Sequence, residues 1–152
     1  MVIEIRKATE TETDILLSFE KGIIATERPF DSTLKDGDIH YYDLVELIRS
    51  DRSEVLIAVV NNEIVGSGYA KIVSAQPYLK FNEYAYLGFM YVIPAFRGQG
   101  INQKIIQGLL DWAKSKNLTE VRLEVYEENI VAKNRYLKAG FKPNLLEMRL
   151  EI

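Results

Sequence analysis

The chain contains no cysteine, only one histidine and only four prolines among its 152 residues. Without cysteine it can form no disulfide, no thiolate metal site and no cysteine nucleophile. A serine–histidine–aspartate triad or a multi-histidine zinc site would have to be built on His40 alone. We therefore expect chemistry that needs neither a metal nor a covalent cysteine intermediate.

Positive charge is also in short supply. The 19 lysines and arginines are outnumbered by 22 aspartates and glutamates, which gives a net charge of −3. This balance argues against a nucleic-acid-binding surface and favours small neutral or cationic partners. No apolar run approaches the roughly 20 residues that cross a bilayer, and no signal peptide is visible, so we expect no membrane partner and a location in the cytosol.

Length and composition are those of an ordinary globular domain. A chain of 152 residues, 47% of them apolar, fits one domain spanning residues 1–152. A domain of this size buries roughly two thirds of its unfolded surface, so it needs no disulfide or metal to fold. No internal repeat and no linker interrupts it.

The hydrophobic periodicity predicts alternating strands and helices. Strands are expected over residues 2–7, 55–60, 64–74, 83–93, 121–125 and 141–152. Helices are expected over residues 9–24, 38–50, 98–116 and 129–139. Thr11 or Thr13 could cap the first helix, and Gly140 should end the last. The order β-α-α-β-β-β-α-β-α-β implies an α/β (α+β) fold, with a mixed sheet and helices on both faces.

The most distinctive segment is the glycine-containing turn Arg97-Gly98-Gln99-Gly100, which lies between a strand and an amphipathic helix. Glycines free the backbone to approach a ligand, and a helix start presents unpaired amides and positive potential to an anion. A dinucleotide fingerprint fails because Gln103 stands at its last glycine position, and no P-loop is present. A tight turn without any ligand remains the plainer interpretation of this segment by itself.

Together with its flanks, the turn resembles a family motif. Val92-x-Pro94-x-x-Arg97-Gly98-x-Gly100-Ile101 is similar to motif A of the GNAT superfamily of N-acetyltransferases, written Q/R-x-x-G-x-G/A. The resemblance implies that the backbone from Arg97 to Gln103 cradles the pyrophosphate of coenzyme A. The residues concerned are Arg97, Gly98, Gln99, Gly100, Ile101, Asn102 and Gln103. Asn102 replaces the usual glycine or alanine, so we expect altered contacts rather than lost binding.

A second segment resembles motif B of the same superfamily. The pattern N-x-x-A-x-x-x-Y-x-x-x-G-F is matched from Asn129 to Phe141. The resemblance implies that Asn129 bonds the pantetheine arm and that Tyr136 serves the thioester sulfur as a catalytic residue. Asn129 could instead be a helix N-cap, and Tyr136 could be a core aromatic.

The resemblance also implies where the thioester lies and how it reacts. The family places it in a split between two neighbouring strands, here residues 83–93 and 121–125, with the amides of Met90, Tyr91 and Val92 gripping it. An amine attacks directly while Tyr136 assists the departing sulfur. Glu124 matches the catalytic base of ribosomal-protein acetyltransferases. Glu83 and a water relay remain alternatives for the base.

Aromatic and charged residues that could recognise the acceptor gather in three segments. They are Glu27–Phe30, His40–Tyr42 and Pro77-Tyr78, and ordinary half-buried aromatics are an equal alternative. We predict an acetyl-CoA-dependent N-acetyltransferase that acts on a primary amine of a small molecule. The alternatives are a protein or peptide N-acetyltransferase, a catalytically silent acyl-CoA-binding module and an ATP-binding protein, the last disfavoured because a Walker lysine is missing. The sequence is compatible with a homodimer but does not predict one.

Overall fold

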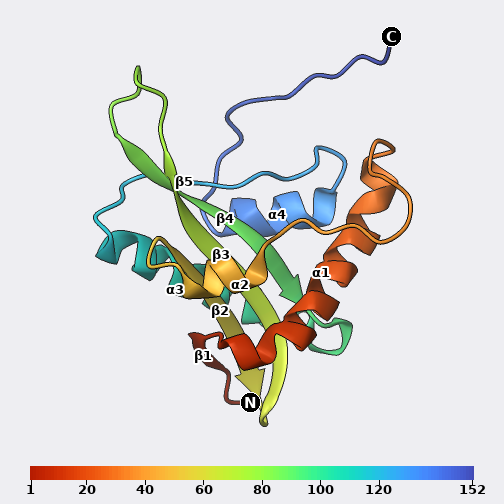
Figure 1. The fold of residues 1–152 in the computed structure, drawn as a ribbon, viewed down its shortest axis with the longest axis vertical. Helices are drawn as coiled ribbons and strands as arrows, with labels where there is room; N and C mark the ends of the chain where they lie inside the picture. The colour runs from red at the N-terminus through yellow and green to blue at the C-terminus, as the bar shows by residue number, and fades with distance from the viewer.

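A single five-stranded sheet organises the computed structural model, which describes all 152 residues. Its strands follow chain order: β1 (Glu4–Lys7), β2 (Ser53–Val60), β3 (Glu63–Ser74), β4 (Glu83–Val92) and β5 (Val121–Arg122). Neighbours from β1 to β4 run antiparallel, whereas β5 runs parallel to β4 (Figure 1). The predicted mixed sheet is confirmed.

Helices cover both faces of the sheet, as predicted. On one face α1 (Thr13–Glu27) and α2 (Leu44–Arg49) enclose a core that contains Leu16, Ile57 and Phe89. On the other face α3 (Ile101–Ser115) encloses a core that contains Leu56, Leu87 and Ile105. The last helix, α4 (Ile130–Lys138), follows β5. No helix is long and apolar enough to span a membrane.

The first helix begins differently from the prediction. A 3₁₀ turn, η1 (Glu10–Glu12), precedes α1, and Thr9 rather than Thr11 or Thr13 is the residue that caps it. The Thr9 amide donates to the Glu12 carboxylate at 2.8 Å, because a glutamate three residues after a threonine can reach back to the cap.

The predicted second helix, residues 38–50, is wrong over its first half. The carboxylate of Glu20, fully buried on α1, accepts hydrogen bonds from the amides of Tyr41 and Tyr42 at 2.9 Å each. Amides bound to that carboxylate are held in a non-helical approach, and α2 starts only after Asp43, whose side chain caps it.

A bulge interrupts β4 near its carboxyl end. Tyr69 pairs with Gly88 and Ser67 pairs with Tyr91, so the register between β3 and β4 shifts there. Phe89 has a φ of 59°, and its carbonyl accepts a hydrogen bond from the buried Ser67 hydroxyl at 3.0 Å. The bulge re-aims the last residues of β4 just before the glycine-containing turn.

Two predicted strands are wrong in extent. β5 contains only Val121 and Arg122 instead of residues 121–125, because β4 and β5 diverge beyond this point. Residues 141–152 form no strand and pair with none of the five strands, since their backbone makes no hydrogen bond beyond Phe141. They leave α4 as an extended tail that points away from the body of the molecule (Figure 1).

Candidate active site

The glycine-containing turn connects β4 to α3 through a short 3₁₀ turn, η3 (Pro94–Phe96). Gly98 and Gly100 have φ values of 77° and 81°, so the right-handed helix cannot start at residue 98 as predicted and begins at Ile101. A Cβ atom added at either glycine would meet nothing within 4 Å. The turn is therefore an open cradle, which we define as Gly98–Gln103.

Arg97 fastens this cradle to the end of β4. Its Nε donates to the Val92 carbonyl at 2.8 Å, and its guanidinium lies 5.6 Å from the centre of the Tyr91 ring. The side chain of Arg97 therefore bonds other groups of the protein. An anion at this turn would instead meet the backbone amides of the cradle. Ile101 is buried in the core, whereas Gln99 and Gln103 are exposed.

Asn102 is the unusual member of the cradle. Its side chain is only 8% exposed, yet neither its oxygen nor its nitrogen has a hydrogen-bond partner. A buried polar group without a partner is costly, and such groups are rare in folded proteins. An orphaned amide in the first turn of α3 fits a site that is completed by a polar ligand.

The expected split between the two central strands is present. β5 pairs with β4 only at Ala85 and Tyr86, and nothing pairs with β4 on that side from there to Val92. The Met90 side chain lies against α3, whereas the Tyr91 ring lies 5.0 Å from Phe19 on α1. The backbone of Met90, Tyr91 and Val92 thus borders the split and leads directly into the cradle.

Motif B contributes two further residues to α4, one at its N-cap and one in its second half. The side-chain oxygen Oδ1 of Asn129 accepts from the Ala132 amide at 3.2 Å, so the residue is an N-cap, while its side-chain nitrogen Nδ2 has no bond within the protein. The Tyr136 ring packs edge-on against Phe141 with centres 6.1 Å apart. Burial raises the pKa of Tyr136 and keeps its hydroxyl, which has no partner in the protein, protonated.

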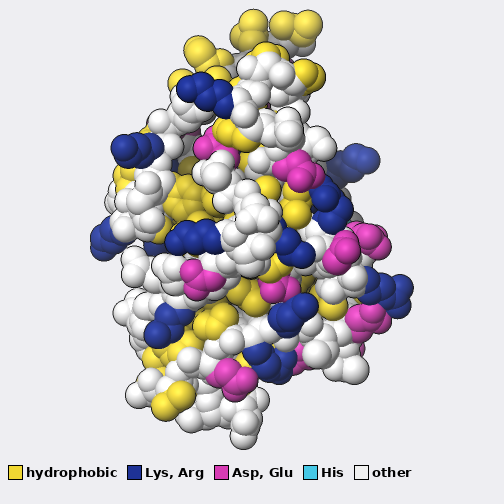
Figure 2. Space-filling model, turned by 90° about the vertical axis from the view of Figure 1, so that its left-hand side faces the viewer, with side chains coloured by type: hydrophobic (Ala, Val, Ile, Leu, Met, Phe, Trp, Pro, Cys, Tyr) yellow, Lys and Arg dark blue, Asp and Glu magenta, His cyan; other side chains and the backbone are white.

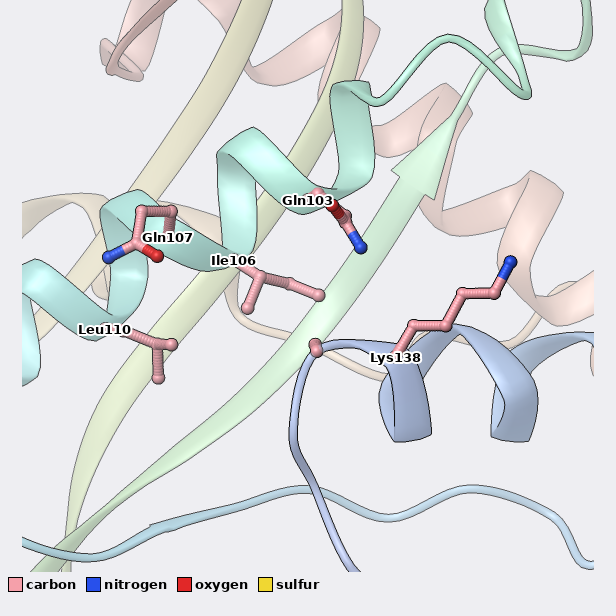
Figure 3. Close-up of a pocket in the computed structure, with 6 residues that line it drawn as sticks. Gln103, Ile106, Gln107, Leu110 and Lys138 are labelled. Atoms are coloured by element: carbon pink, nitrogen blue, oxygen red, sulfur yellow. The ribbon is translucent and has the colours of Figure 1, made fainter.

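A groove of about 220 Å³ lies between α3 and α4 (Figure 3). It is lined by Gln103, Ile106, Gln107, Leu110, Lys138 and Ala139. Gln103 belongs to both the cradle and the groove, so the groove begins next to the cradle. Its mixed lining of amide, aliphatic and lysine side chains suits a long polar ligand.

On the α1 side of the split, two loops meet. The Tyr126 hydroxyl donates to Asp31 at 2.9 Å, and the Phe30 and Tyr126 rings stack with centres 6.1 Å apart. Nearby, burial raises the pKa of Glu27, at the end of α1. Glu124 lies beside Tyr86, whose pKa is raised by burial first and by the Glu124 carboxylate second. The α1 side of the split therefore contains several carboxylate and tyrosine side chains.

Two residues lie elsewhere: Glu83, an alternative for the base, and Tyr78, from a segment predicted to recognise the acceptor. Glu83 forms an ion pair with Arg52 at the start of β4, the opposite end of the strand from Val92. Tyr78, 82% exposed, is in the β3–β4 loop, which projects at the upper left of Figure 1, whereas the loop after α1 lies at the right. The structure therefore does not bring Glu83 or Tyr78 to the split.

Three features of this region were not predicted from the sequence. The bulge at Phe89 is signalled only by Gly88, a glycine inside a strand pattern. Glu20 stands on the apolar stripe of α1, and a charged residue at such a position signals a buried polar contact. The contact between Asp31 and Tyr126 joins residues 95 positions apart, and no local pattern predicts it.

Comparison with known proteins places the chain in a family. The family model for the acetyltransferase (GNAT) family matches residues 22–141, and the chain therefore belongs to this family. The match to motif A and motif B lies within these residues.

Individual relatives are more distant. The thialysine N-epsilon-acetyltransferase of Mus musculus is 43% identical over 55 residues, which are 36% of this chain and 32% of that protein. The chain spans about a third of the length of this and one further curated relative. The aminoglycoside N(6')-acetyltransferase type 1 of Salmonella typhimurium is 22% identical over 92% of both chains.

Solved structures share the fold. A predicted acetyltransferase of Clostridium acetobutylicum, solved with acetyl-CoA, has a TM-score of 0.79 at 23% identity and covers 99% of this chain and 96% of its own. At this identity the likeness establishes the fold and leaves the substrate open.

Proposed function

We propose that the protein, as a single domain over residues 1–152, transfers the acetyl group of acetyl-CoA to a primary amine of a small molecule. The observation that supports this most is the split between β4 and β5 opening onto the cradle at the start of α3. The cradle would then offer an anion site, and the split would offer room for the pantetheine arm and the thioester.

The cradle and its surroundings are well suited to the coenzyme. The amides of Gly98–Gln103 would hold the pyrophosphate, and the buried amide of Asn102 would gain a partner there. The peptide groups of Met90–Val92 and the free amide nitrogen of Asn129 would position the pantetheine arm. Relatives solved with acetyl-CoA or coenzyme A support the choice of this co-substrate.

The chain supplies the proton transfers that the reaction needs. The amine must attack as the neutral base, and the coenzyme leaves as a thiolate when the carbon–sulfur bond breaks. Glu124 would accept the proton of the amine, directly or through water, and the protonated Tyr136 would give its proton to the sulfur. Since the attack is direct, no covalent enzyme intermediate is needed, in keeping with the lack of cysteine.

A small cationic amine is the favoured acceptor. The Glu124 carboxylate lies beside Tyr86 on the α1 side of the split, where it would attract an ammonium group, whereas Asp31 is already paired with Arg149. The relative matched over nearly its whole length is an aminoglycoside acetyltransferase, which supports a small-molecule acceptor as well. The cytosol stays the predicted location.

Thiol release from acetyl-CoA with a panel of amines tests the proposal. Polyamines, amino acids, aminoglycosides and short peptides would be assayed, with product mass confirming acetylation. Turnover of a small amine, weakened by added salt through a higher KM, is expected because exposed charges are screened over about 10 Å at 0.1 M salt. Turnover confined to peptides with a free N-terminus would establish the protein-acetyltransferase alternative instead.

A further inference from the structure

Glu27, at the carboxyl end of α1, is a half-buried acid without a basic partner. Every other buried or half-buried acidic side chain pairs with an arginine, a lysine or a histidine. These paired acids are Glu12, Glu20, Asp31, Glu54, Glu83 and Glu120. The surface is mixed in the same way, and Figure 2 shows lysines and arginines spread among the aspartates and glutamates of one face. Because a partly desolvated carboxylate is costly unless a cation lies beside it, Glu27 lacks a partner that a ligand could supply.

Tyrosine rings lie around this carboxylate. The Tyr41 hydroxyl lies next to it, yet that hydroxyl is buried and has no partner within hydrogen-bond distance. The turn that follows Glu27 brings Tyr126 to the same place, because the Tyr126 ring stacks on Phe30 and its hydroxyl donates to Asp31 at 2.9 Å. Burial is the main cause that raises the pKa of Tyr41 and of Tyr126, and the Glu27 carboxylate raises both further. A carboxylate among tyrosine rings is a favourable surrounding for an alkylammonium ion.

Two aromatic contacts connect Glu27 to the split between β4 and β5. The Tyr41 ring meets Tyr42 edge-on with centres 5.7 Å apart. Tyr42 in turn meets Phe89, at the bulge of β4, with centres 5.2 Å apart. An ammonium group bound at Glu27 would therefore lie beyond the place where the thioester reacts, and not at the reacting atoms themselves.

Lys71 supplies positive charge farther along the same side of the sheet. Its Nζ lies 5.6 Å from the centre of the Tyr86 ring and 5.9 Å from that of Tyr69. Glu124 lies beside the same Tyr86 ring, so a reacting amine near Glu124 would be favoured in its neutral form by the charge of Lys71. A permanent second positive charge would be repelled there. Since no basic side chain pairs with Glu27, the end of α1 is the favourable place for it.

We propose that the acceptor is a small aliphatic diamine and that Glu27 binds the ammonium group that is not acetylated. Glu124 takes the proton of the other amino group, whose nitrogen bonds the acetyl carbon as the carbon–sulfur bond breaks. The departing thiolate receives a proton from Tyr136. Glu27 is then a specificity-determining residue that touches the far end of the substrate, and this inference rests on the proposed function.

Acetylation of diaminobutane, aminobutanol and butylamine tests the preference, because these amines share one chain length and only the first carries a second charge. The natural chain should favour diaminobutane at least tenfold in kcat/KM. Glu27→Gln, which removes the charge and keeps the shape, should raise KM for diaminobutane about 10- to 100-fold, the worth of a hydrogen bond to a charged group. Its kcat and its turnover of butylamine should stay unchanged. Glu63→Gln removes the same charge from the exposed β2–β3 turn and should change neither value.

Calorimetric titration of diaminobutane into the complex of the chain with coenzyme A measures the same contact without turnover. Binding to Glu27→Gln should be at least tenfold weaker than binding to the natural chain. Acetyl-CoA affinity and the melting temperature of the free protein show whether the variant is folded. Neither should fall, because Glu27 lies apart from the cradle and its carboxylate forms no ion pair that the amide would lose.

Three results would overturn the inference. One is a natural chain that acetylates butylamine as well as diaminobutane. Another is a Glu27→Gln variant that keeps the preference for diaminobutane or binds it as tightly as the natural chain does. The third is a Glu27→Gln variant with an equal loss of kcat for all three amines, which would make Glu27 the base. If acetyl-CoA bound but no amine were acetylated, the proposed function would fail, and the titration of diaminobutane would still decide the role of Glu27.

Discussion

At the scale of single residues, Tyr136 has the most direct proposed part in the chemistry. Burial raises its pKa, so the hydroxyl stays protonated in the neutral range and can donate to a leaving thiolate. Tyr136→Phe is expected to lower kcat by about 10- to 10⁴-fold with little change in acetyl-CoA affinity. The ring still packs against Phe141, so the fold should survive.

Steady-state kinetics together with calorimetric titration of acetyl-CoA would measure both quantities. Tyr84→Phe is a matched control, because Tyr84 lies at the closed end of β4 and stacks on Arg122 instead of facing the split. Full activity of the Tyr136→Phe variant would return Tyr136 to a purely structural role in α4.

A second prediction for a single residue concerns Asn102, and it covers both the stability of the free protein and its affinity for acetyl-CoA. Its buried amide has no partner, so Asn102→Ala should leave the melting temperature of the free protein unchanged or raise it. The same change should weaken acetyl-CoA binding about 3- to 10-fold, the worth of one hydrogen bond. Asn134→Ala, on the exposed side of α4, serves as the control. A destabilised variant that binds acetyl-CoA normally would contradict the proposed contact.

At the scale of elements, the cradle can be tested against a loop of the same backbone geometry. Gly100 and Gly37 have φ values of 81° and 83°, and neither would bring an added Cβ within 4 Å of another atom. Alanine at either site should therefore cost a similar ~1–2 kcal/mol of folding free energy. Only Gly100→Ala should also weaken acetyl-CoA binding, because its Cβ would stand where the pyrophosphate approaches the backbone.

Thermal melts of both variants, with and without acetyl-CoA, separate the two effects. Gly100→Val should abolish the stabilisation by the ligand altogether. If acetyl-CoA raised the melting temperature of Gly37→Ala as little as that of Gly100→Ala, the effect would be a general one on folding. The cradle would then not be the binding site for the pyrophosphate.

The contact between α1 and the segment before α2 predicts a pH dependence. Glu20 accepts from His40 Nδ1 at 2.7 Å, and this bond raises the pKa of His40, with Asp38 adding to the effect and Lys21 opposing it. A histidine whose folded-state pKa is raised stabilises the protein fully below its unfolded value of about 6.5. That contribution is lost as the pH rises through the higher folded-state pKa.

Melting temperatures between pH 6 and pH 9 would measure this dependence. The natural chain should lose stability over that range by more than a His40→Ala variant does. Glu20→Ala should be far more damaging at every pH, since it leaves the amides of Tyr41 and Tyr42 without their acceptor, at ~1–3 kcal/mol for each buried group. If the melting temperatures of the natural chain and of His40→Ala changed identically with pH, the bond between Glu20 and His40 would not be a source of pH sensitivity.

At the scale of the whole molecule, the local patterns predicted the sheet, its two helical faces and the cradle. These features depend on periodicity and on glycines, which act within a few residues. What the sequence could not predict depends on distant partners. The length of α2 is decided by Glu20, the length of β5 by its divergence from β4, and the site's α1 side by the pair of Asp31 and Tyr126. Residues 141–152 alternate like a strand, but none of the five strands of the sheet pairs with them.

Calorimetric titration of the natural chain with acetyl-CoA, ATP and NAD would show whether the cradle and the split form one coenzyme A site. All three ligands carry a pyrophosphate, but only acetyl-CoA also has the arm and thioester that the split between β4 and β5 would hold. Acetyl-CoA is expected to bind at one site per chain, and ATP and NAD far more weakly. Equal binding of NAD and acetyl-CoA, or no binding of acetyl-CoA, would contradict it.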